Sequence, residues 1–96
     1  MIAITNKNKV TRYYNPETDY YAIYTDIVRC INPYTDFVNI DKKTHNIASG
    51  IACWCEMATY GEKYENNITE KYGIEIMCYD KDLGIDYNYD DIDYEY

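Results

Sequence analysis

The residue pattern with the clearest chemical content lies near the C-terminus of this 96-residue chain, where carboxylates and tyrosines alternate. From Ile85 onward, isoleucine or tyrosine occupies every second position, and Asp91 shifts the alternation by one residue, as a β-bulge would. The segment 79–96 contains seven acidic residues and one lysine, so it carries −6 of the formal net charge of −8 and leaves −2 for residues 1–78. The acidity is therefore concentrated in the last fifth of the chain.

Alternating carboxylates and tyrosines are suited to binding a basic protein surface. A carboxylate accepts two parallel hydrogen bonds from an arginine, and tyrosine adds contact area with little loss of side-chain entropy. The alternative interpretation is an acidic tail, folded or unfolded, that only aids solubility. We predict a partner-binding set that consists of Asp86, Tyr87, Tyr89, Asp90, Asp91, Asp93, Tyr94 and Glu95.

The predicted partner is a basic nucleic-acid-binding protein or effector complex. Direct binding of nucleic acid is not expected, because phosphates are neutralised by clustered lysine and arginine, and here 9 such residues face 17 acids. One row of strand carboxylates has a charge about every 6.7 Å, whereas duplex DNA has one about every 1.7 Å. Unless the target is a groove for one strand or a short duplex element, other acids have to join the same face. The candidates are Glu17, Asp19, Asp26, Glu62 and Glu65.

Residues suited to catalysis or metal binding are few. The chain has one histidine, His45, and no G-x-S-x-G, phosphate-loop or H-E-x-x-H motif. His45 precedes Cys53 by about two helical turns, or roughly 12 Å, which is too far for a hydrogen bond within one helix. The segment 80–86 departs from a calcium-binding EF-hand loop at Gly84 and Ile85. We therefore predict no enzyme activity, no cofactor and no metal, with free thiols at Cys30, Cys53, Cys55 and Cys78.

The N-terminal third predicts a hairpin followed by a helix. Residues 1–5 and 10–14 are expected to form strands joined by a turn. Asn15 is suited to the N-cap and Pro16 to the first position of a helix. Apolar residues then recur with helical spacing until Asn32-Pro33, so the helix is predicted over about 16–31.

A second helix is predicted in the middle of the chain, after an extended run at 37–40 and a turn at 41–43. Thr44 or Asn46 is expected to cap it, and an apolar face follows over residues 47–58. Gly50 inside this helix would allow another backbone to approach closely, and Gly61 is expected at the C-cap.

The remaining residues predict strands. The pattern of 62–72 fits either a hairpin or a short helix. After Gly73 the period changes to two, which predicts a strand over 74–79, a turn at 80–84 and a second strand reaching about residue 90.

These elements predict one domain over residues 1–96, with an acidic, tyrosine-rich C-terminal segment at 79–96. The expected fold class is α+β, with two helices packed on one face of a small antiparallel sheet. No stretch approaches the roughly 20 apolar residues of a membrane span, and Met1–Thr5 lacks the basic region of a signal peptide. We therefore expect a cytoplasmic protein without a membrane partner.

The length, the acidity, the richness in Asn, Ile, Lys and Tyr, and the lack of an enzyme motif place the chain beside a known class of inhibitors. It resembles the small acidic anti-CRISPR proteins encoded by phages and, more loosely, antirestriction proteins that mimic DNA. The resemblance implies that the protein blocks a CRISPR effector where the effector binds nucleic acid, in its positively charged channels.

The alternative function is a small acidic protein-interaction or homodimeric structural protein of a phage or mobile element, without inhibitory activity. Exposed tyrosines would supply its interface. Trp54 is expected in the core, because it lies within the apolar helix.

Overall fold

Short apolar strands and two amphipathic helices organise the chain around one core. The computed structural model describes residues 1–79, in which a three-stranded antiparallel sheet accompanies three helices. The predicted α+β class is therefore confirmed. The elements in order are β1 (Ile2–Thr5), β2 (Thr11–Tyr14), α1 (Tyr20–Ile31), α2 (Lys42–Met57), α3 (Asn67–Tyr72) and β3 (Glu75–Cys78).

The sheet has the order β2-β1-β3, so the N-terminal strand lies in the centre. Ile2 pairs with Tyr14 on β2 and with Cys78 on β3, and Ile4 pairs with Ile76. These side chains are buried and belong to the core. The predicted N-terminal hairpin and the strand after Gly73 are both confirmed.

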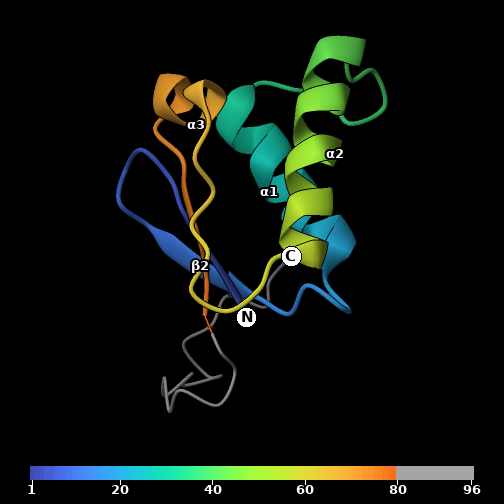
Figure 1. The fold of residues 1–96 in the computed structure, drawn as a ribbon. Helices are drawn as coiled ribbons and strands as arrows, with labels where there is room; N and C mark the ends of the chain where they lie inside the picture. The colour runs from blue at the N-terminus through green and yellow to red at the C-terminus, as the bar shows by residue number, and fades with distance from the viewer. Residues whose placement is uncertain (80–96) are drawn as a thin grey trace.

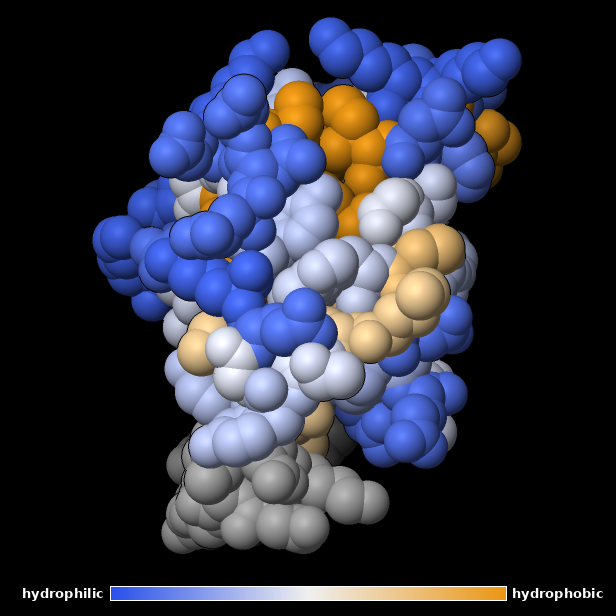
Figure 2. Space-filling view, viewed as in Figure 1, coloured by the Kyte–Doolittle hydropathy of each residue, from blue (hydrophilic) through white to orange (hydrophobic). Residues whose placement is uncertain are grey.

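α1 and α2 pack against each other and cover one face of the sheet, as Figure 1 shows. α1 buries Ile23, Ile27 and Val28, and α2 buries a stripe of mostly small side chains that includes Ala48 and Ala52. Some apolar surface stays exposed over α1 in the space between α2 and α3 (Figure 2). Trp54 is only partly buried, where its ring packs edge-on against Tyr64 at 5.1 Å between centroids.

α1 begins four residues later than predicted. Asp19 is its N-cap, and residues 16–18 form a turn instead of the first helical turn. The side chain of Asn15 accepts a hydrogen bond from the Glu17 amide, and the Asp19 carboxylate accepts one from the Asn15 amide. The capping residue at position 15 therefore closes a tight turn before the helix. The predicted end of the helix, at Ile31, is confirmed.

α2 begins earlier than predicted. Asp41 caps it by accepting a hydrogen bond from the Thr44 amide at 3.1 Å, so Lys42 and Lys43 are helical and neither Thr44 nor Asn46 is the cap. The predicted extended run at 37–40 is also wrong. These residues form a turn and a bend, with the Val38 amide donating to Asp36 at 2.9 Å.

The glycine predictions for α2 are wrong as well. The helix ends at Met57, and Gly61 follows in a turn with a φ of 87° instead of serving as the C-cap. A Cβ placed at Gly50 would meet no atom within 4 Å, so no other backbone segment of residues 1–79 approaches there.

Residues 61–72 contain both a paired strand-like segment and a short helix. Cys78 donates its amide to Glu62, and Tyr64 donates to Ile76, which extends the sheet irregularly beyond β3. α3 then follows, capped by Asn66 and terminated by Gly73 in the left-handed region with a φ of 70°. A Cβ at Gly73 would lie 2.8 Å from the Lys7 Cβ, so this glycine allows the β1–β2 turn to pack against α3.

Candidate functional site

The predicted partner-binding set, Asp86 to Glu95, lies outside the described residues, as do the turn at 80–84 and the second strand predicted after it. The described residues do show where on the molecule residue 79, which precedes that segment, lies. Tyr79 donates its amide to the Met1 carbonyl at 2.7 Å, and the Met1 amino group donates to the Tyr79 carbonyl at 2.8 Å. The Gly61 amide donates to Cys78 at 2.9 Å. The start of β1, the end of β3 and the turn after α2 therefore meet at this end.

The same end of the molecule is acidic. The segments that meet there, 15–22, 51–62 and 76–79, contain no lysine or arginine, and the Met1 amino group is already bonded to Tyr79. Exposed Tyr21, Met57 and Tyr60 border it. We call this surface the acidic end and define it by its four carboxylates, which are Glu17, Asp19, Glu56 and Glu62.

Local contacts hold the Glu62 carboxylate in place and favour its ionised form. Glu62 accepts hydrogen bonds from the amide and the hydroxyl of Thr59, and these bonds lower the pKa of Glu62. The hydrogen bond with Cys53 raises the pKa of the Tyr20 hydroxyl, and the nearby Glu56 carboxylate raises it further. Glu56 therefore lies close to Tyr20, at the start of α1.

Lysines are concentrated at the opposite end. β1 runs from the acidic end to the β1–β2 turn, which carries Lys7 and Lys9. α2 ends at the acidic end and starts with Lys42 and Lys43, and Lys71 lies in α3 before β3 returns. Glu65, Glu70 and Glu75 lie among these lysines, so the far end is mixed in charge, and the acidic end differs from it by its lack of lysine and arginine.

Asp26 does not join the acidic end, contrary to the role considered for it. Its side chain is 10% exposed, accepts a hydrogen bond from the Tyr14 hydroxyl at 2.8 Å and lies 3.7 Å from an Arg12 nitrogen. The Cys30 thiol is 3.9 Å away. Burial raises the pKa of Asp26 despite these lowering contacts. Asp26 is therefore an internal carboxyl group that fastens α1 to β2.

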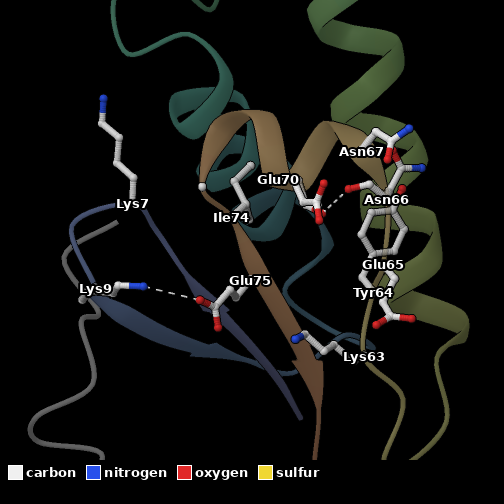
Figure 3. Close-up of a pocket in the computed structure, with 12 residues that line it drawn as sticks. Lys7, Lys9, Lys63, Tyr64, Glu65, Asn66, Asn67, Glu70, Ile74 and Glu75 are labelled. Atoms are coloured by element: carbon white, nitrogen blue, oxygen red, sulfur yellow. Dashed lines mark hydrogen bonds and ion pairs between the residues drawn. The ribbon is translucent and has the colours of Figure 1, made fainter.

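Glu65 also lies elsewhere, in a cavity of about 610 Å³ between the β1–β2 turn, α3 and β3. Figure 3 shows lysines and glutamates around it, including the Lys9–Glu75 ion pair at 3.5 Å. Both partners of that pair are well exposed, so the pair contributes little to stability. Three lysines and three glutamates line the cavity and balance in charge, and neither histidine nor cysteine is among the lining residues.

The histidine and the cysteines are separated. His45 Nδ1 is 2.8 Å from the Tyr24 hydroxyl near the start of α2, whereas Cys53 contacts Tyr20 near its end. Burial raises the pKa of both Cys30 and Cys55 to about 12, so these thiols stay protonated. Within residues 1–79, no group of three or more His, Cys, Asp or Glu side chains is placed to hold a metal ion.

Sequence reasoning therefore identified Glu17, Asp19 and Glu62 as acids able to join one surface, and it missed Glu56. The signal for Glu56 was present, because two antiparallel helices joined by one connection bring the end of the second beside the start of the first. In the part of the chain that the structure describes, no helix is long and apolar enough to cross a membrane. Comparison with protein-family models, with curated proteins and with solved structures found no match.

Proposed function

We propose that the protein is an anti-CRISPR-like inhibitor, which binds a basic nucleic-acid-binding surface of a CRISPR effector and blocks DNA or RNA binding by occupying it. The observation that supports this proposal is the acidic end. Residues 80–96, with a net charge of −6, continue directly from the surface that carries Glu17, Asp19, Glu56 and Glu62.

The acidic end adds negative charge to that of the C-terminal segment, whose carboxylates alone are too widely spaced to match duplex DNA. One strand row of carboxylates is about fourfold too sparse to match duplex DNA. Four further carboxylates from two other parts of the chain adjoin residue 79, which raises the density of negative charge offered to arginines. Arginine pairs with carboxylates through two parallel hydrogen bonds, and exposed tyrosines add contact area. Attraction between the opposite charges speeds association and weakens with salt.

The distribution of charge favours one orientation of binding. The lysines of the β1–β2 turn and of α2 lie at the far end, mixed with carboxylates. A positively charged channel would therefore attract the acidic end, which has no lysine or arginine, more strongly than the far end. We therefore propose that the protein enters such a channel with its acidic end first and that no enzymatic step is involved.

The test is affinity capture from bacterial lysates that contain CRISPR effectors, followed by a cleavage assay with the captured complex. The proposal requires recovery of a nucleic-acid-binding complex at low salt, loss of that complex at high salt, and inhibition of target cleavage. The variant Asp90→Lys/Asp91→Lys/Asp93→Lys should lose inhibition. Recovery of only the protein itself would favour the homodimeric structural alternative.

A matched control variant distinguishes the effect of these particular carboxylates from the effect of net charge. The variant Asp36→Lys/Glu65→Lys/Glu70→Lys changes the net charge by the same amount on exposed residues away from the acidic end. It should inhibit nearly as well as the wild type. Equal loss of inhibition in both variants would contradict a specific role for the C-terminal carboxylates Asp90, Asp91 and Asp93.

A further inference from the structure

A second cavity, of about 300 Å³, shares Lys7 of the β1–β2 turn with the cavity in Figure 3. It is lined by residues of that turn, of β2, of the C-terminal half of α1, of the turn after α1, and of α3. Three of the eight lysines and arginines before residue 80 line it, together with a single acid. They are Lys7, Arg12 and Arg29, and the acid is Asp26.

The guanidinium groups of Arg12 and Arg29 each contact another side chain of the protein. Arg12 is 3.7 Å from the Asp26 carboxylate, which is itself fixed by the Tyr14 hydroxyl. The Arg29 guanidinium lies over the Phe37 ring at 5.3 Å from the centroid, a cation–π contact. Because these side chains are already ordered, binding a ligand immobilises few further rotamers.

Lys7 is positioned by backbone packing. Its Cα and Cβ lie against Gly73, where a side chain would not fit. In Figure 3 the Lys7 side chain extends away from Lys9 and Glu75, so its ammonium group takes no part in that ion pair. Three cations from β2, α1 and the β1–β2 turn thus border one concave site around one partly neutralised carboxyl.

Aromatic rings complete this cavity. Tyr34, in the turn after α1, is 94% exposed, and Tyr72 at the end of α3 is half-buried under Lys71. An exposed tyrosine ring beside clustered cations is suited to stacking on a planar base while the cations bind a phosphate. The volume is at the lower limit for small-molecule sites, about 300 Å³.

We propose that this cavity binds a small phosphate ester with a planar ring, of the nucleoside monophosphate class. Arg29 and Lys7 contact the phosphate, Arg12 borders it, and Tyr34 stacks on the base. The site is distinct from the acidic end, so its existence does not depend on the proposed inhibitory function.

The test is isothermal titration of the full chain with adenosine monophosphate, inorganic phosphate and adenosine. The nucleotide should bind at one saturable site, phosphate about tenfold or more weakly, and adenosine without measurable affinity. Arg29→Gln should weaken nucleotide binding about tenfold or more, because it removes charge-assisted hydrogen bonds. Tyr34→Ala should weaken binding of the nucleotide but leave that of phosphate unchanged.

One further variant tests whether the attraction is local. Lys42→Gln removes one positive charge outside the cavity and should leave binding unchanged.

Three results would overturn the proposal. One is the absence of saturable nucleotide binding at millimolar concentration. Another is an equal weakening by Lys42→Gln and Arg29→Gln, which would mean unspecific attraction. The third is self-association of the chain that Arg29→Gln abolishes while the nucleotide has no effect, which would assign the cavity to an interface between copies.

Discussion

Burial works against the ionised form of the Asp26 carboxyl group. This group lies in the core, next to Arg12, and desolvation raises its pKa above the ordinary value of 3.8. A raised pKa means that the folded protein binds this proton more tightly than the unfolded chain does. The stability that this proton supplies is complete below pH 3.8 and is lost as the pH rises through the folded-state pKa.

The first prediction follows from that sign. Asparagine at position 26 does not titrate, so the free energy of unfolding of Asp26→Asn relative to the wild type should increase as the pH rises from 3.8 through the folded pKa. Urea denaturation of both proteins from about pH 3, roughly a unit below the ordinary carboxyl pKa, to about pH 8 measures the difference. The other carboxyls titrate in both proteins and cancel. A difference independent of pH would contradict the assigned pKa direction.

The second prediction concerns the thiols. Cys53 is exposed, whereas Cys55 is buried and has its pKa raised to about 12. A thiol reagent at pH 8 should therefore modify Cys53 in the native protein and reach Cys55 only after unfolding, because the thiolate is the reactive form. Cys53→Ser should remove the fast phase of labelling. A fast phase that persists in this variant would place another thiol at the surface.

At the scale of elements, hydrophobic periodicity identified β1, β2, α1, most of α2 and β3, because burial on one face imposes that period. Helix starts were harder to predict. Several residues before each helix have side chains able to cap it, such as Asn15 and Asp19 before α1, and each can close a tight turn instead. Which of them caps the helix depends on how the preceding turn packs, and local sequence does not encode that packing.

The third prediction compares two glycines. Gly73 has a φ of 70° and packs against Lys7, so Gly73→Ala should destabilise the protein by about 1–2 kcal/mol or more. Gly50 lies within α2 with open space around it, so Gly50→Ala should stabilise by about 0.5–1 kcal/mol. Urea denaturation measures both. Equal effects of the two substitutions would refute the close packing of the β1–β2 turn on α3.

For the whole molecule, the C-terminal acidity is visible in the sequence, but the surface that adjoins it is not. Glu17, Asp19 and Glu62 reach one end because α1 and α2 run antiparallel and residues 61–64 pair with β3. Asp26 does not reach that surface, because it lies on the buried side of α1 and contacts Tyr14 and Arg12 of β2. That contact joins residues far apart in the chain, so no local pattern reveals it.

The fourth prediction tests the acidic end as a steering surface. Glu17→Lys/Glu56→Lys should lower the association rate with the captured effector about tenfold at low salt, and the difference should shrink at high salt. Glu65→Lys/Glu70→Lys, with the same change in charge at residues lining the cavity of Figure 3, should have a smaller effect. Surface plasmon resonance at two salt concentrations gives both rates. A loss that does not vary with salt would argue against electrostatic steering.

The most direct measurement of the central claim is a competition binding experiment with the captured effector and its nucleic acid. The proposal predicts mutual exclusion, in which the protein displaces labelled DNA or RNA and an excess of nucleic acid releases the protein. Asp90→Lys/Asp91→Lys/Asp93→Lys should not compete. A stable ternary complex of effector, nucleic acid and protein, or full competition by that variant, would contradict occupancy of the nucleic-acid-binding surface by these carboxylates.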